Sequence, residues 1–263
     1  MIKNIIKNLD KKFFFGLIKK LKNKFDDTNR KEIHKKFVKK MLNKTEHKNF
    51  TFLNNDKKNK LSELCENYGS DKGYIDFEKE NIWPWKPHTY TNLYDKLFNH
   101  CRENIKLVFE CGVGTTNNSI PCNMSSKGKP GASLRVWREY FYNAEIFGAD
   151  IDKQILFTED RIKTFYVDQL NNNSIKNMWK EINRNNFDLI IDDGLHNYEA
   201  GKNLFLESFS KLKSGGIYII EDVSNSYFEK LFDSLKEYDP EGIVLFDKNQ
   251  FWYGNNLIII RKK

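Results

Sequence analysis

The residues of this chain that could do chemistry fall into two groups, each placed directly after an apolar run. Asp192, Asp193 and His196 follow the first run, and Glu221 and Asp222 follow the second. Carboxylates that converge repel one another unless a cation or a raised pKa neutralises them, and a hard divalent cation does so with oxygen ligands. Acids at strand ends can also be solvated loop residues or helix caps, but titratable groups that cluster favour a site. We therefore expect a divalent-cation site here.

The stretch from residue 187 to residue 223 must position both groups. Its pattern predicts a buried strand, a crossover helix that ends near Lys213 and the pair Gly215 and Gly216, and a second buried strand. Such a unit is a right-handed crossover between parallel strands, so both groups emerge at the same edge of the sheet. Open α/β folds bind their ligands at that edge.

A third segment, LVFECGVG, adds a glycine loop. Residues 107–109 form an apolar strand, and Glu110, Gly112 and Gly114 follow it in a loop that lets the backbone approach a ligand closely. The loop differs from the dinucleotide-binding pattern because Asn117 stands at the position of its third glycine. It also lacks the Gly-Lys-Ser/Thr ending of a P-loop.

Two further predicted strands end in polar residues. Residues 145–149 lead into Asp150, and residues 164–167 lead into Asp168 and Gln169. An acid at the end of the second strand is where nucleotide-binding folds hold a ribose diol. Each successive strand therefore places a polar group at the same edge of the sheet.

These elements predict an α/β protein with a Rossmann-like, doubly wound and mostly parallel sheet. The segments GIVLFD and NNLIIIRKK can pair as a hairpin, which would place an antiparallel C-terminal strand in the sheet. We expect residues 1–60 to form a basic helical extension and linker, with the linker over KTEHKNFTFLNNDKKNK. Residues 61–105 are expected to form a helical cap or lid, and residues 106–263 the catalytic domain.

The charge of the chain is distributed unevenly. Residues 1–60 carry 19 Lys and Arg against 6 Asp and Glu, and the remainder carries 25 against 30. A nucleic-acid-binding protein more often carries a basic face on its folded domain, so we expect no nucleic-acid partner.

The first 50 residues have the pattern of two amphipathic helices. Their predicted apolar faces are formed by Ile2, Ile6, Leu9, Phe13, Leu17 and Leu21, and then by Ile33, Phe37, Met41 and Leu42. A basic amphipathic helix can lie on an anionic membrane, or it can pack on its own domain or on a twin subunit.

The four cysteines show no CxxC pair and no metal-finger spacing, and no signal peptide or spanning run is evident. We therefore expect reduced cysteines and a cytoplasmic protein, with residues 1–50 as a candidate peripheral contact at the inner face of the membrane.

The order of the motifs ECGVG, ADID, VDQ, FDLIIDDGLH and GGIYIIEDV resembles the class I S-adenosylmethionine-dependent methyltransferases. More narrowly, the chain resembles the magnesium-dependent sugar O-methyltransferases of antibiotic and surface-polysaccharide pathways. The likeness begins at about Leu61, reaches the C-terminus and includes YGSDKG, HTYTNLYDKLF and PGASLRVWREYF. The DDGLH and IEDV pair is its specific part, whereas the glycine loop is generic.

This resemblance implies roles for individual residues. Asp193, Glu221 and Asp222 match the metal ligands of the family, and His196 matches its proposed base. The implied cofactor-binding residues are Glu110, Gly112 and Gly114 at the methionine part, Asp150 at the ribose hydroxyls, and Asp168 with its neighbour Gln169 at the adenine.

The resemblance implies methyl transfer from S-adenosyl-L-methionine to a sugar hydroxyl, with Mg²⁺ as a second cofactor. Coordination to Mg²⁺ lowers the pKa of the hydroxyl, and His196 can accept its proton. The expected acceptor is a nucleotide-linked sugar of surface polysaccharide (capsule) biosynthesis. The resemblance also makes a homo-oligomer a candidate assembly.

Two other functions are compatible with parts of the pattern. A nicotinamide-dependent sugar oxidoreductase or epimerase could use the same layered sheet, since fold does not determine function. The missing third glycine argues against it. A non-catalytic adaptor could use the basic N-terminal segment to reach a membrane.

Overall fold

The computed structural model describes residues 29, 32–37, 39–40, 50–53, 58–73, 85, 88–245 and 256–263. The chain separates into two compact units, one formed by residues 1–46 and 251–253 and the other by the remaining residues.

In the first unit, the described residues are helical, as predicted for the second amphipathic helix. Phe37 is buried, but Ile33 is 46% exposed and His34 is buried in its place. Of the predicted apolar face, Ile33 is thus exposed, and the buried positions, His34 and Phe37, are three residues apart on one side of the helix. The other residues of the predicted apolar faces lie outside the described part of the chain.

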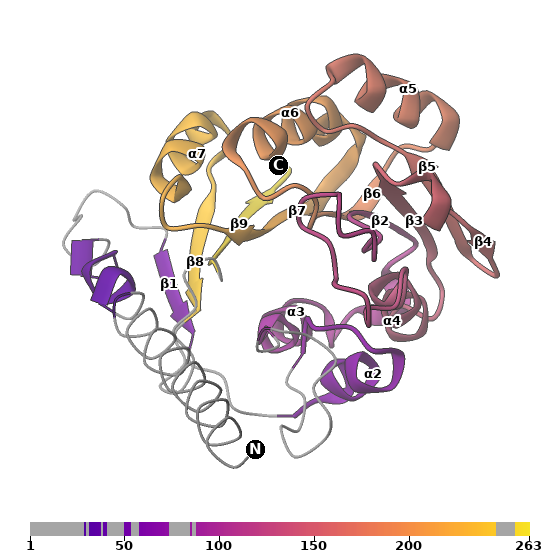
Figure 1. Ribbon diagram of the computed structural model, residues 1–263, viewed down its shortest axis with the longest axis horizontal. Helices are drawn as coiled ribbons and strands as arrows, with labels where there is room; N and C mark the ends of the chain where they lie inside the picture. The colour runs from indigo at the N-terminus through magenta and orange to yellow at the C-terminus, as the bar shows by residue number, and fades with distance from the viewer. Residues whose placement is uncertain are drawn as a thin grey trace, which may run out of the picture. The chain divides into compact units, whose positions relative to one another are not determined.

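The described strands of the second unit form one sheet of nine strands in the order β1-β8-β9-β7-β6-β2-β3-β5-β4 (Figure 1). The five central neighbours from β7 to β5 run parallel, and the β4–β5, β7–β9 and β8–β9 pairs are antiparallel. The strands are β1 Phe50–Leu53, β2 Leu107–Cys111, β3 Glu145–Asp150, β4 Thr158–Glu159, β5 Ile162–Tyr166, β6 Phe187–Asp192, β7 Leu212–Val223, β8 Glu241–Leu245 and β9 Asn256–Arg261.

The C-terminal strands confirm the predicted hairpin. Strand β9 pairs antiparallel with both β7 and β8 and therefore lies between them. The mostly parallel, doubly wound sheet with an antiparallel strand from the C-terminus is the predicted fold class.

The predicted linker before residue 61 is wrong at Phe50–Leu53. These residues form β1, which pairs parallel with β8 in the register Phe50↔Gly242 to Leu53↔Leu245. A strand of four residues flanked by Lys and Asn carries little local signal, and its formation depends on a partner strand far along the chain.

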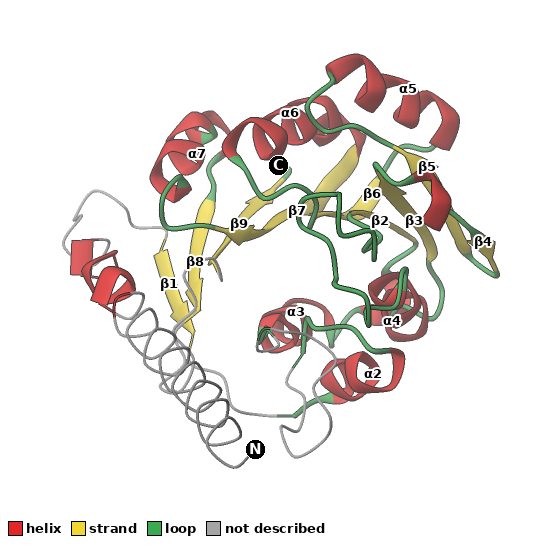
Figure 2. Ribbon diagram, in the orientation of Figure 1, coloured by secondary structure: helices red, strands yellow, loops and turns green. Residues whose placement is uncertain are grey.

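Helices cover both faces of the sheet (Figure 2). Helices α2, α3 and α4 lie on one side, and α5, α6 and α7 lie on the other. The helices are α2 Lys60–Tyr68, α3 Tyr90–Phe98, α4 Ala132–Tyr140, α5 Asn172–Ile182, α6 Tyr198–Ser208 and α7 Phe228–Ser234, with 3₁₀ turns η1 Arg102–Asn104, η2 Lys153–Ile155, η3 Phe209–Lys211 and η4 Lys236–Tyr238. Among the described residues, no helix combines the length and the apolar character that crossing a membrane requires.

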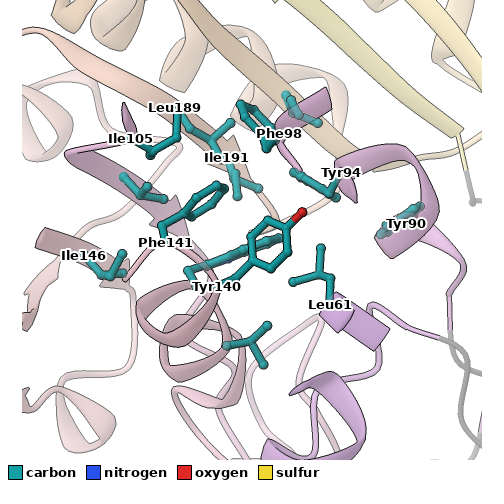
Figure 3. Close-up of a cluster of buried hydrophobic side chains, with 14 of the residues drawn as sticks. Leu61, Tyr90, Tyr94, Phe98, Ile105, Tyr140, Phe141, Ile146, Leu189 and Ile191 are labelled. Atoms are coloured by element: carbon teal, nitrogen blue, oxygen red, sulfur yellow. The ribbon is translucent and has the colours of Figure 1, made fainter. Parts of the chain in front are cut away.

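The segment expected to form a cap or lid is packed into the core where it is described. Leu61 of α2 and Tyr94 of α3 are fully buried in one cluster with Phe141 after α4 and Ile191 of β6. Figure 3 shows these side chains facing one another between the helices and the sheet. Helices α2 and α3 therefore pack against the sheet and form part of the hydrophobic core.

Replacing Phe141 by Ala should destabilise this core. The Phe141 ring is fully buried. Its centroid lies 5.4 Å from that of Phe98, in an edge-on arrangement, and 5.9 Å from that of Trp137. Loss of a buried Phe side chain costs about 3–5 kcal/mol. Urea unfolding should show this loss, whereas Tyr142→Ala at the next, 51% exposed position should change stability by only about 0.5 kcal/mol. Equal effects of the two substitutions would contradict the packing described here.

Candidate functional site

Strand alternation brings three acids to one face of the sheet. Side chains two positions apart on a strand share a face, so Asp193 lies on the face of the buried Ile191, which α2, α3 and α4 cover. Glu110 of β2 and Glu221 of β7 are buried on the same face. Ligand atoms of Glu110, Asp193 and Glu221 lie within 4.8 Å of one another. We call these three residues the inner acid group.

The cation inside the inner acid group is Lys72, from the segment between α2 and α3. Its Nζ donates to Asp193 Oδ2 at 2.5 Å, lies 3.0 Å from Glu110 Oε1 and also donates to Glu221 Oε2. The Lys72 side chain is 3% exposed. The amide of Thr91 donates to the Lys72 carbonyl at 3.2 Å, which ties the segment to the start of α3. Sequence reasoning missed Lys72.

The charges of the inner acid group do not cancel. Burial disfavours the ammonium of Lys72, but Asp193, Glu221 and Glu110 outweigh it and raise the pKa of Lys72 well above its ordinary value. Burial also raises the pKa of Glu110 and of Glu221, against the opposing effect of Lys72. Three carboxylates share one ammonium, so their remaining negative charge favours a further cation or proton nearby.

A second set of ligand atoms adjoins the first and shares Asp193 with it. Asp193, His196 and Asp222 offer atoms that lie within 4.8 Å of one another, and all three are half-buried. His196 Nε2 is 3.9 Å from Asp193 Oδ1 and 3.6 Å from Asp222 Oδ2. We call these three residues the outer ligand group.

Unusual backbone conformations aim two members of the outer ligand group. His196 and Asp222 have φ values of 50° and 51°, in the left-handed region. Asp222 follows Glu221 on β7 and would alternate to the other face, but the pairing of β7 with β9 shifts register between Ile220 and Val223. A left-handed conformation costs a non-glycine residue about 1–2 kcal/mol, and such conformations cluster at functional sites.

The structure therefore divides the expected metal ligands between two groups. Asp193 and Asp222 lie together with His196, whereas Glu221 faces Lys72 and also accepts a hydrogen bond from the Tyr94 hydroxyl at 2.5 Å. Asp193 belongs to both groups. His196, expected as the base, lies among the candidate ligand atoms.

Residues before and in α3 complete the surroundings of Asp222. Tyr90 donates to Asp222 Oδ1, and His88 Nδ1 is 3.5 Å from the same oxygen, with its ring stacked on that of Tyr90 at 4.7 Å. Although burial opposes ionisation, His88, His196 and Tyr90 hold the pKa of Asp222 below its ordinary value. No functional role was predicted from the sequence for Tyr90, Tyr94 or His88. The spacing of Tyr90 and Tyr94 by four residues on the core-facing side of a helix was an available signal.

The glycine loop after β2 contacts residues 192–196, which carry Asp193 and His196 and which we call the acid segment. Gly112 has φ 99°, and a Cβ atom there would lie 2.1 Å from the Asp193 carbonyl oxygen. The Asp193 amide donates to the Cys111 carbonyl at 2.9 Å. Gly114 has φ 89° and equally little room for a Cβ, beside the sulfur of Met124. The absence of side chains thus lets the loop approach Asp193 directly.

Asp150 holds the glycine loop from the end of β3. Its Oδ2 accepts hydrogen bonds from the amides of Val113 at 2.8 Å and Gly114 at 3.2 Å. Glu110, at the other side of the loop, accepts from Ser133 Oγ at 2.7 Å and Trp137 Nε1 at 3.1 Å. The Glu110 carboxylate therefore accepts hydrogen bonds from two side chains of α4 in addition to its contact with Lys72.

Asp168 and Gln169 follow β5 at the same edge. Gln169 Nε2 donates to Asp192 Oδ1 at 2.7 Å, and Gln169 Oε1 accepts from the Leu195 amide at 2.8 Å. The side chain of Gln169 thus supports the segment that carries Asp193. Asp168 is half-buried and accepts from the Leu170 amide at 2.9 Å.

The residues present fit a divalent cation. Asp193 and Asp222 supply carboxylate oxygens and His196 an imidazole nitrogen at mutual distances that one ion can span, and His88 and His196 hold the pKa of Asp222 below its ordinary value against the effect of burial. Carboxylate oxygens suit Mg²⁺ and Ca²⁺, and imidazole suits transition metals. The outer ligand group therefore offers a mixed donor set next to the glycine loop.

Replacing Gly112 by Ala should disturb the acid segment, because the new Cβ meets backbone rather than a movable side chain. Gly215→Ala is the matched control, since Gly215 also has a positive φ (76°) but nothing lies within 4 Å of its Cβ position. The control should lose only the cost of the left-handed backbone, about 1–2 kcal/mol. Urea unfolding should show a larger loss for Gly112→Ala, and equal losses would disprove the close approach.

No model of a known protein family matches the chain, but individual relatives do. It is 31% identical over 168 residues to the 8-demethyl-8-alpha-L-rhamnosyl tetracenomycin-C 2'-O-methyltransferase of Streptomyces olivaceus, which is 64% of this chain and 39% of the relative. It is 30% identical over 169 residues to the mycinamicin VI 2''-O-methyltransferase of Micromonospora griseorubida, 64% of this chain and 37% of that one. The chain thus spans about two fifths of the length of the relatives it matches.

A solved structure with the same fold is the MycE methyltransferase from the mycinamycin biosynthetic pathway, in complex with Mg and SAH. Its TM-score is 0.55 at 24% identity, over 79% of this chain and 55% of that one. The resemblance seen in the motifs is thereby confirmed. The chain has the Rossmann-like fold of class I methyltransferases, and the relatives that its sequence matches are sugar O-methyltransferases of antibiotic biosynthesis.

Proposed function

We propose that the chain is an S-adenosylmethionine-dependent, divalent-metal-dependent O-methyltransferase that acts on a sugar hydroxyl. The observation that carries the proposal is the contact between the glycine loop and the acid segment at Gly112 and Asp193. In this proposal the glycine loop would take the methyl donor, and its contact with Asp193 would keep the donor next to the outer ligand group. Relatives that transfer methyl groups to sugars of glycosylated antibiotics support the reaction class.

The donor would bind at the carboxyl edge of β2, β3 and β5. Gly112 and Gly114 let the backbone approach the methionine part, Asp150 would hold the ribose hydroxyls, and Asp168 would face the adenine. Glu110 and Gln169 would not contact the donor directly, because the Glu110 carboxylate pairs with Lys72 and the Gln169 amide donates to Asp192. In this proposal those two residues shape the cofactor site through the loops they hold.

Asp193 and Asp222 would hold the cation on the acceptor side of the donor. A bound Mg²⁺ would supply Lewis acidity that lowers the pKa of a sugar hydroxyl. Glu221 is the third expected ligand, and in our proposal it acts through Asp193, with which it shares Lys72. In this proposal His196 is not a ligand: its Nε2 lies 3.9 Å from Asp193 Oδ1 and 3.6 Å from Asp222 Oδ2, and it would accept the hydroxyl proton as the methyl group is transferred.

The finer proposal concerns the acceptor. We infer a nucleotide-linked sugar of surface polysaccharide, such as a capsule, as the acceptor class. The relatives named above act, by their names, on rhamnosyl tetracenomycin and on mycinamicin. An acceptor panel should therefore contain both sugar nucleotides and glycosides of small molecules.

The purified protein should transfer a labelled methyl group from S-adenosylmethionine to a member of this panel, and EDTA should abolish the transfer. Added Mg²⁺ should restore it, because the cation activates the hydroxyl. The measurement is incorporation of label into the acceptor. Transfer that is equally fast after complete removal of metal would refute the metal role, and a stabilising shift with NAD but not with S-adenosylhomocysteine would refute the donor.

His196→Ala should lower turnover by about 10²–10⁴-fold, the usual contribution of a general base. Because His196 is half-buried, with φ 50°, the variant should remain folded. His100→Ala is the matched control, since His100 is exposed and borders a pocket lined also by Asp188 and Lys213. A His196→Ala enzyme with the turnover of the control would disprove the assignment of the base.

A further inference from the structure

The inner acid group has the spacing of a metal site, yet it already contains a cation. Ligand atoms of Glu110, Asp193 and Glu221 lie within 4.8 Å of one another. The Nζ atom of Lys72 contacts all three carboxylates. Two adjoining groups with metal-ligand spacing therefore share Asp193, and one of them is filled by a side chain of the protein itself.

We propose that Lys72 is a positioning residue of the active site: its ammonium fills the inner acid group, fixes Asp193 through Oδ2, and so confines divalent-cation binding to the outer ligand group. This inference rests on the proposed function, because it concerns the metal site of that function. It assigns a role to Lys72, which lies in the matched motif YGSDKG but to which the sequence analysis gave no function.

The two oxygens of Asp193 carry the argument. Oδ2 accepts the Lys72 hydrogen bond at 2.5 Å, whereas Oδ1 lies on the side of His196, 3.9 Å from its Nε2. A carboxylate held by one oxygen presents the other in a defined direction. Lys72 thereby sets which oxygen of Asp193 is available to the outer ligand group.

The position of Lys72 is itself determined from several sides. Its carbonyl accepts the Thr91 amide, and its own amide donates to Ser70 Oγ at 3.4 Å. Glu221, which shares the ammonium, is also held by Tyr94. Lys72 thus connects the segment between α2 and α3 to acids that follow or lie on β2, β6 and β7. Removing a residue that hydrogen-bonds to a metal ligand commonly lowers metal affinity by about 10–100-fold.

The test measures Mn²⁺ binding to the full chain by calorimetry and by the electron paramagnetic resonance signal of free Mn²⁺. The wild-type chain should bind one Mn²⁺. Lys72→Met leaves three carboxylates without their ammonium, so it should bind a second Mn²⁺ at the inner acid group and bind the first about 10–100-fold more weakly.

A charge-matched variant covers the case in which Lys72→Met fails to fold. Lys72→Met combined with Glu110→Gln removes one positive and one negative charge, so the net charge of the inner acid group stays as in the wild type. This double variant should still bind Mn²⁺ about 10–100-fold more weakly, because the hydrogen bond that orients Asp193 is lost. Wild-type affinity in the double variant would overturn the inference.

Lys213→Met is the control for removing the lysine partner of a buried carboxylate as such. Lys213 pairs with Asp188 at the start of the same strand, β6, and the Asp188 side chain is 2% exposed. This control should lose stability but keep the Mn²⁺ affinity of the wild type. If it lost as much affinity as the Lys72 variants, the effect would be general destabilisation and the inference would fall.

The wild-type result separates this inference from the proposed function. A wild-type chain that binds no Mn²⁺ would overturn both the metal role and the role of Lys72. A wild-type chain that binds Mn²⁺, together with a double variant of equal affinity, would overturn only the role of Lys72.

Discussion

The arrangement of the site depends on one electrostatic constraint: several carboxylates meet at the carboxyl edge of a parallel sheet, where their mutual repulsion must be offset. Parallel strands that end in acids force this convergence, because all their carboxyl ends lie at one edge. The protein offsets the repulsion with positive and hydrogen-bonding groups from outside the sheet. Lys72 serves the inner acid group, and Tyr90, His88 and His196 surround Asp222. A segment that appeared from the sequence to be a lid therefore contributes to the charge balance at the carboxyl edge of the sheet.

Much of the fold could be predicted because its signals are local. Apolar runs followed by acids identified β2, β3, β6 and β7, and the two final runs identified the hairpin of β8 and β9. The strand β1 was not found in this way, because an apolar run of only four residues, FTFL, does not by itself indicate a strand that pairs with β8. On the N-terminal helix, His34 and not the apolar Ile33 is buried together with Phe37, which the apolar pattern does not indicate.

The convergence of Asp193, Glu221 and Asp222 could be predicted, but their division could not. Strict alternation would have put Glu221 and Asp222 on opposite faces of β7, and the irregular pairing with β9 together with the left-handed backbone of Asp222 changes that outcome. Neither feature has a signal in a single sequence, because Asp222 is not a glycine. Lys72 was missed for another reason: it lies 121 positions before Asp193. Its proximity to the three acids is evident only in the folded structure.

The pairing of β1 with β8 has a consequence for how the protein can be shortened. Backbone donors and acceptors on the outer side of β8 are satisfied by residues 50–53, which come from the opposite end of the chain. A protein begun after Leu53 would leave β8 as an open strand whose unpaired groups can recruit another copy of the chain. Because β1, of four residues, is itself the outermost strand of the described sheet, it shortens this edge and does not close it, and truncation within residues 50–53 would expose the longer edge of β8.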